Sequence, residues 1–209
     1  YTLDAWFLAV ETVADAAGLA RFALLMSQGG AIAIAYAVRH PERVERLVLY
    51  GAYARGVLKR DGGARQRDEF EAMTRMIEWG WGRENPAFRL TFTSLFLPDG
   101  TPEEVDSFNR LQQVSTSPEN AAAMVRGFAE IDVQAIAPQV RCPTLVLHAH
   151  GDERVPFDEG RRIAGLIPDA RFVPLESRNH VLLAHEPGWR VMVAELHAFL
   201  DPVVTLAPT

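Results

Sequence analysis

Apolar residues follow two different patterns in the first part of this chain. Residues 3–17 place apolar side chains at helical spacing and are followed by Gly18, which predicts a helix that stops at that glycine. Residues 21–26 form a short, almost wholly apolar run, and a small-residue stretch of helical character follows at residues 31–38. The order of these patterns predicts a strand, a sharp turn and a helix.

Three further apolar runs, within residues 44–53, 143–148 and 171–175, predict strands. A continuous apolar run is typical of a strand that is buried on both faces, as strands of parallel sheets are. Helical patterns occupy residues 157–166 and 187–200, after the second and third of these runs. This alternation predicts the α/β fold class, with a parallel sheet flanked by helices.

Residues 54–140 have a different pattern, in which helices are joined by polar segments. Thr101 and Glu104 fit a capping box at the start of one of these helices. We therefore predict an α/β core formed by residues 1–53 and 141–200, an all-helical cap inserted between them as residues 54–140, and a loose tail at residues 201–209.

Charge and composition exclude several classes of partner. The formal net charge is −6 and the basic residues are dispersed, so we expect no binding of nucleic acid. No apolar stretch reaches the ~18 residues that span a bilayer and no signal peptide is visible, so we expect no membrane association. The single cysteine, Cys142, cannot form an internal disulfide, which agrees with a cytoplasmic location. We expect no cofactor and no metal.

Three residues suited to nucleophilic catalysis follow predicted strands. Ser27 lies on a strand-to-helix turn before two glycines, and Asp152 and His180 follow later strands. Side chains just beyond the carboxyl ends of parallel strands gather at one edge of the sheet. A serine hydroxyl needs a base to take its proton and an acid to orient that base. The order Ser, Asp, His along the chain is that of hydrolases with a nucleophile elbow.

Several segments together resemble the α/β-hydrolase superfamily: residues 22–30 around the serine, 37–49, 143–156 and 178–187. The resemblance covers nearly all of the chain. It implies that Ser27 is the nucleophile, His180 the general base and Asp152 the orienting acid. It also implies that the backbone N–H of Gln28 belongs to an oxyanion hole. The implied substrate is a small or medium carboxylic ester, cleaved through an acyl-enzyme on Ser27.

The chain departs from this family in two respects. Leu25 occupies the position two residues before the serine, where the family has glycine because the turn is tight. The first predicted strand corresponds to the fifth strand of the family, so we expect strands five to eight only. In the family, the loop that supplies the second oxyanion donor lies before the fifth strand, in the part of the fold that we do not expect here. We expect the apolar edge at residues 21–26 to be covered by a second copy, as a homodimer, or by another polypeptide.

Alternative interpretations remain for several features. The chain could be a catalytically weak, hydrolase-like module that binds a ligand or acts as a sensor within a larger regulatory protein. His148 and His150 alternate near a strand, but no ligand cluster accompanies them, which disfavours a metal site. The aromatic residues of the insertion could form its core or line an acyl pocket; they are Trp79, Trp81, Phe88, Phe92 and Phe96.

Overall fold

The computed structural model describes residues 2–201, and nearly all of the predicted tail, residues 202–209, lies outside this range. Eight α-helices, two short 3-10 helices and four strands occur in the described part. In chain order they are α1 (Leu3–Ala16), β1 (Phe22–Met26), α2 (Gly30–Arg39), β2 (Val44–Tyr50), η1 (Val57–Lys59), α3 (Gly63–Gly80), α4 (Ala87–Thr93), α5 (Pro102–Ser115), α6 (Pro118–Glu130), η2 (Ala137–Gln139), β3 (Thr144–Ala149), α7 (Phe157–Leu166), β4 (Arg171–Leu175) and α8 (Pro187–Leu200).

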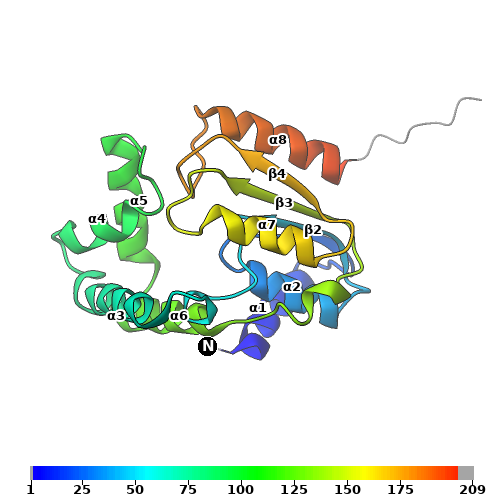
Figure 1. The fold of residues 1–209 in the computed structure, drawn as a ribbon, viewed down its shortest axis with the longest axis horizontal. Helices are drawn as coiled ribbons and strands as arrows, with labels where there is room; N and C mark the ends of the chain where they lie inside the picture. The colour runs from blue at the N-terminus through cyan, green and yellow to red at the C-terminus, as the bar shows by residue number, and fades with distance from the viewer. Residues whose placement is uncertain (1, 202–209) are drawn as a thin grey trace, which may run out of the picture.

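The four strands form one parallel sheet in the order β1-β2-β3-β4, which confirms the predicted α/β class. Alternate residues of β2 face opposite layers. Leu47 and Leu49 join the core beneath α2 and α7, whereas Val48 joins the core beneath α8. All three are fully buried, as expected for a strand covered on both faces. Figure 1 shows α8 on one side of the sheet and α2 and α7 on the other.

Local sequence signals set several helix boundaries. The helix α1 ends just before Gly18, whose φ of +69° is a conformation that glycine adopts without strain. Thr101 and Glu104 form the predicted capping box at the start of α5, with each side chain bonded to the other residue's backbone N–H. The helices α7 and α8 have the predicted bounds.

A helical segment, which we define as residues 54–140, connects β2 to β3. Its helices α3 to α6 pack around their own apolar cluster, which includes Ile77, Trp81, Phe92 and Phe96. In Figure 1 the arrowheads of β3 and β4 point toward this segment. The helical segment therefore lies beside the carboxyl ends of the strands, where the three candidate residues are also expected.

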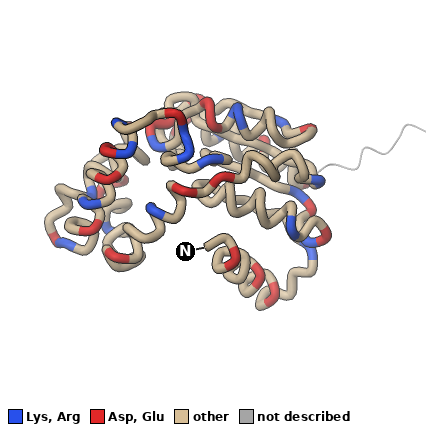
Figure 2. Tube along the Cα trace, turned by 60° about the horizontal axis from the view of Figure 1, so that its bottom comes forward, with Lys and Arg blue, Asp and Glu red and all other residues tan. Residues whose placement is uncertain are grey.

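The surface carries interspersed charges. Figure 2 shows basic and acidic positions alternating along the trace, without a continuous basic stripe in that view. Within residues 2–201, no helix combines the length and the apolar character needed to cross a membrane. Cys142 is half-buried against the core, and burial raises the pKa of its thiol.

Candidate active site

Ser27 lies in the turn between β1 and α2. The backbone N–H of Gly30 donates to the carbonyl oxygen of Ser27 at 2.8 Å, which closes the turn. Gly30 also lets α2 approach the segment after β2, because a Cβ atom at this position would lie 2.4 Å from the Cβ of Ala52. This close packing places Ser27 at the carboxyl end of β1 and beside the N-terminus of α2.

Leu25 is accommodated because β1 is the outer strand of the described sheet. Half of the surface of Leu25 is exposed and it joins none of the apolar clusters, so its side chain has open space at the face of this outer strand. Asp169 is the one non-glycine residue between residues 2 and 201 with a positive φ. Ser27 is thus not held in the strained backbone conformation that a nucleophile elbow normally imposes.

A chain of hydrogen bonds joins the three candidate residues. The Ser27 Oγ atom lies 3.2 Å from Nε2 of His180, and Nδ1 of His180 lies 2.7 Å from Oδ2 of Asp152. The other carboxylate oxygen of Asp152 accepts the backbone N–H groups of Arg154 and Val155 at 2.9 and 2.8 Å. Because a carboxylate can only accept, Nδ1 carries the proton and Nε2 is free to accept from the serine hydroxyl.

Neighbouring residues fix the position of His180. The hydroxyl of Tyr50 donates to the carbonyl oxygen of His180, and burial raises the pKa of Tyr50, which keeps this donor protonated. Gly51 has a φ of +54°, and a Cβ atom there would lie 2.7 Å from Cε1 of His180. The ring of Phe96, from the helical segment, meets the imidazole edge to face at 5.3 Å. The imidazole therefore has little room to rotate.

A buried polar network holds the loop that carries His180. One carboxylate oxygen of Glu186 accepts the hydroxyl of Ser177 at 2.6 Å, and the other accepts the N–H of Leu183 at 2.6 Å. The side-chain oxygen of Asn179 accepts the N–H of Asp99, which ties the loop to the helical segment. Sequence reasoning assigned no role to these residues. The one visible signal was a carboxylate directly before the first residue of a helix, at Glu186.

His148 lies behind Asp152 and is fully buried. Its Nε2 atom lies 2.9 Å from the carbonyl oxygen of Val155, so Nε2 carries the proton. Burial lowers the pKa of His148, which favours the neutral ring. Between residues 2 and 201, no three His, Cys, Asp or Glu side chains are arranged to hold a metal ion. His148 thus supports the loop that carries Asp152.

Gln28 follows the serine and contributes two groups to the site. Among the described residues its backbone N–H has no hydrogen-bond acceptor, so it can donate to a developing oxyanion. Its side-chain oxygen accepts from Nη2 of Arg154 at 3.2 Å. Sequence reasoning identified the first of these groups and missed the second, which joins residues 126 positions apart.

Three hollows surround these residues. The edge groove, of about 630 Å³, runs along β1 and α1 and includes Ser27 and Gln28. The aromatic cavity, of about 290 Å³, lies under the helical segment and shares Gln28 with the edge groove. The Arg154 cavity, of about 260 Å³, adjoins it and shares Arg154 and Phe92 with it. The three hollows are therefore neighbours, with Gln28 lining the first two and Arg154 lining the second and third.

Three of the aromatic residues of the helical segment combine the two predicted roles, and Trp79 has neither. Trp81, Phe92 and Phe96 are buried in its core and also line the aromatic cavity. Trp79 is 64% exposed and lines none of the three hollows. Core packing and cavity lining thus coincide in three of these side chains.

Comparisons with known proteins agree with this architecture. A family model described as serine aminopeptidase, S33, matches residues 3–188. A pyrrolizixenacetamide deacetylase from Xenorhabdus hominickii is 29% identical over 91% of this chain and 70% of its own length. A pimeloyl-[acyl-carrier protein] methyl ester esterase from Chromobacterium violaceum is 26% identical over 81% of this chain and 66% of its own length.

A solved structure of an esterase from Exiguobacterium antarcticum has a TM-score of 0.79 and 23% identity. The match covers 94% of this chain and 74% of that one, and at this identity it reports on the fold alone. The chain spans between 57 and 70% of the length of the curated relatives it matches.

Proposed function

This chain belongs to the serine aminopeptidase S33 family of α/β hydrolases, and from that premise we propose that it hydrolyses small or medium carboxylic esters through an acyl-enzyme on Ser27. The observation that carries the proposal is the continuous hydrogen-bond chain from Ser27 through His180 to Asp152. The three residues come from separate loops and have the geometry that activates an alcohol.

In the first half of the reaction, Ser27 Oγ attacks the carbonyl carbon of the ester and its proton passes to Nε2 of His180. Asp152 stabilises the resulting imidazolium through Nδ1. The backbone N–H of Gln28 donates to the oxyanion of the tetrahedral intermediate. The intermediate then breaks the bond to the alcohol oxygen, which takes the proton from Nε2. The products of this half are the free alcohol and acyl-Ser27.

In the second half, water attacks the acyl carbonyl carbon and gives one proton to Nε2 of His180. The bond between the acyl carbon and Ser27 Oγ breaks, and Oγ takes that proton back. The carboxylic acid leaves and the enzyme is restored. Each donor of an oxyanion hole contributes about 100- to 1000-fold to the rate, so the N–H of Gln28 is an important group for the proposed reaction.

The helical segment acts as a cap in this proposal. Its Phe96 contacts the ring of His180, and the Phe96 carbonyl oxygen accepts the N–H of Val181 at 3.2 Å. Its aromatic side chains line the hollow that continues from Gln28. An acyl chain placed there is shielded from water, which strengthens the electrostatic interactions of the site.

Labelling of the folded chain with a fluorophosphonate tests the proposed nucleophile. We expect one adduct, located by mass spectrometry on the peptide that contains Ser27, and none in Ser27→Ala. The exposed residue Thr91 on α4 provides a matched control, because Thr91→Ala removes a hydroxyl outside the described site. Absence of an adduct on Ser27 in folded protein contradicts the proposal.

A ligand-binding module without turnover is the second candidate function. The unstrained backbone at Ser27 favours it, because a nucleophile elbow normally holds its serine in a strained turn. In that case a small molecule binds saturably, no ester is hydrolysed, and Ser27→Ala leaves the dissociation constant unchanged.

A further inference from the structure

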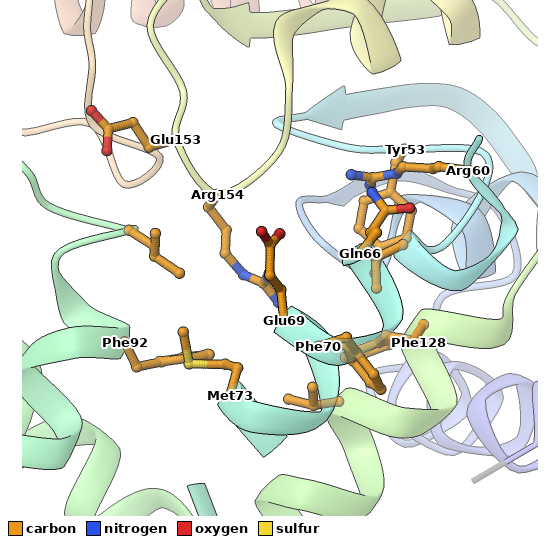
Figure 3. Close-up of a pocket in the computed structure, with 14 residues that line it drawn as sticks. Tyr53, Arg60, Gln66, Glu69, Phe70, Met73, Phe92, Phe128, Glu153 and Arg154 are labelled. Atoms are coloured by element: carbon orange, nitrogen blue, oxygen red, sulfur yellow. The ribbon is translucent and has the colours of Figure 1, made fainter. Parts of the chain in front are cut away.

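Arg154 extends from the loop after β3 into the space between the sheet and the helical segment. Figure 3 shows its side chain reaching toward the middle of the Arg154 cavity, opposite residues of α3. Its backbone N–H donates to Asp152 at 2.9 Å, so the loop that orients the acid also positions this cation. The sequence pattern around residue 154 gave no reason to single it out.

The guanidinium of Arg154 has no carboxylate partner. Within residues 2–201, no Asp or Glu oxygen lies within 4 Å of it, and its one side-chain hydrogen bond goes to the neutral amide of Gln28 at 3.2 Å. Its Nε atom is fully buried and has no hydrogen-bond partner. Its flat face lies 5.5 Å from the ring centroids of both Phe92 and Phe96. Burial lowers the pKa of this guanidinium, which still remains protonated at neutral pH.

Two other enclosed arginines of this protein have more internal partners than Arg154, although the Nε atom of Arg89, like that of Arg154, has no hydrogen-bond partner among the described residues. Arg55 pairs with Glu159 at 3.2 Å and with Asp61 at 3.1 Å. Arg89 is buried and donates to backbone carbonyl oxygens at the end of α3, among them one at 3.0 Å. A buried charge that lacks such partners is costly, because it loses its hydration without compensation. Arg154 is therefore an unsatisfied donor that faces a cavity.

The position of Arg154 connects this cavity to the reaction centre. Its partner Gln28 is the neighbour of Ser27, and the ring of Phe96 touches both the guanidinium and His180. Arg154 lines the aromatic cavity as well as the Arg154 cavity. A substrate group that extends from Ser27 past Gln28 therefore meets the guanidinium.

Building on the proposed ester hydrolysis, we propose that Arg154 binds a second carboxylate of the substrate, and that the preferred substrates are half-esters of short dicarboxylic acids. The planar guanidinium carries charged N–H donors in a fork geometry that matches the two oxygens of a carboxylate. The carboxylate supplies the charge that the protein does not. The reaction at Ser27 is unchanged, since the bound carboxylate takes no part in bond formation or cleavage.

Glu69 is the competing carboxylate of the Arg154 cavity. It comes from α3, and Figure 3 shows it pointing toward the same space as Arg154. Its side chain pairs with Arg65 at 2.8 Å and is 62% exposed. We expect Glu69→Gln to increase the preference for half-esters, because it removes a like charge that repels the substrate carboxylate.

The test compares two esters that differ in one charge. Monomethyl succinate, glutarate and adipate are each matched with the methyl ester of the monocarboxylic acid of the same carbon number. We expect kcat/KM of the wild-type chain to favour a half-ester at least about tenfold, and Arg154→Met to remove that preference by raising KM for the half-ester. Arg154→Lys keeps the positive charge but loses the paired N–H donors of the guanidinium, and it should retain part of the preference for the half-ester.

Arg83→Met is the matched control. Arg83 also stacks on a phenylalanine of the helical segment, Phe88 at 5.6 Å, but lines none of the three hollows. The ratio of kcat/KM for the half-ester to kcat/KM for the neutral ester should be the same in Arg83→Met as in the wild type. The inference is overturned if the wild-type chain hydrolyses the neutral esters without preferring any half-ester, or if folded Arg154→Met keeps the preference.

A binding measurement separates this inference from the proposed function. If the chain neither hydrolyses the neutral esters nor takes up the fluorophosphonate, the proposed function has failed. Calorimetric titration with succinate, glutarate and adipate then tests the subsite alone. Binding of one of these dianions at least about tenfold more tightly by the wild-type chain than by Arg154→Met supports the inference, and equal or absent binding contradicts it.

Discussion

Asp152 and His180 form the acid–base half of the candidate site, and Ser27 and Gln28 form the nucleophile half. The acid–base side chains are at most 2% exposed and follow β3 and β4. Both oxygens of Asp152 have donors, and His180 is bonded at its backbone as well as its ring. The nucleophile half follows β1, an outer strand whose Leu25 is half exposed, and Ser27 and Gln28 line the edge groove of about 630 Å³.

This difference separates two requirements of the same reaction. Proton transfer needs fixed donors and acceptors, and the buried side chains of Asp152 and His180 with their hydrogen-bond partners supply them, although β4 is an outer strand like β1. Substrate binding and oxyanion stabilisation need an open space, and the edge groove beside β1 offers one. We therefore expect changes in the acid–base half to alter chemistry and stability together, and changes at the free edge to alter association.

The largest expected effect tests whether the two halves act as one unit. Ser27→Ala and His180→Ala should each lower kcat for ester hydrolysis by at least about 1000-fold, because either change removes the activated nucleophile. The double variant should be no slower than the slower single variant. The measurement is steady-state hydrolysis of one ester by all four proteins. Multiplicative losses in the double variant indicate that the halves contribute separately and contradict the proposed mechanism.

The acid–base half also makes a prediction about stability and pH. Burial lowers the pKa of His148, so below about pH 6.5 the unfolded chain takes up a proton that the folded chain does not. The stabilisation is present above that pH and is lost as the pH falls. Its contribution is at most about 1.4 kcal/mol for each pH unit.

The measurement for His148 is urea unfolding of the wild type and His148→Gln between pH 8 and pH 5. Glutamine does not titrate, and its amide can still donate to the carbonyl oxygen of Val155. We expect the variant to be less stable than the wild type at pH 8 and to lose less free energy of unfolding on acidification. Equal slopes for the two proteins show that His148 is not the group responsible.

The same two halves differ in how much the sequence revealed. The strands were predictable because β2 and β3 each contain an uninterrupted apolar run, at residues 47–50 and 145–147. The helices α7 and α8 were predictable because local signals mark their ends. A simple rule predicted that Ser27, Asp152 and His180 lie at one edge of the sheet. Each of them follows a parallel strand, and the carboxyl ends of parallel strands meet at the same edge. A local pattern combined with one topological rule was sufficient for these features.

Other features depended on contacts that leave no local pattern. Arg154 is a candidate binding residue because no carboxylate pairs with it among the described residues. Its single side-chain hydrogen-bond partner there, Gln28, is 126 residues away in the chain. Leu25 stands where the family has glycine, which predicts a crowded turn. The outer position of β1 nevertheless gives the Leu25 side chain open space. The spacing of residues along the sequence reveals neither that Arg154 has no carboxylate partner among the described residues nor that one face of β1 is exposed.

The smallest expected effect concerns the free edge of β1. An exposed apolar strand edge is a template for pairing with another strand, and Ala23 and Leu25 are both exposed. We propose that a second copy of this chain, or another polypeptide, covers residues 21–26. At micromolar concentration, sizing with light scattering should then give a mass above that of one 23.2 kDa chain. A clean monomer contradicts pairing between copies.

A lysine substitution locates that contact. Leu25→Lys places a charge on the edge and should weaken association by roughly two- to fivefold, the range expected for one cross-strand pair. Leu111→Lys is the matched control, because Leu111 is 58% exposed on α5, in the helical segment and outside the β1 edge. Equal weakening by both variants indicates a general effect of charge, whereas an effect of Leu25→Lys alone assigns the interface to β1.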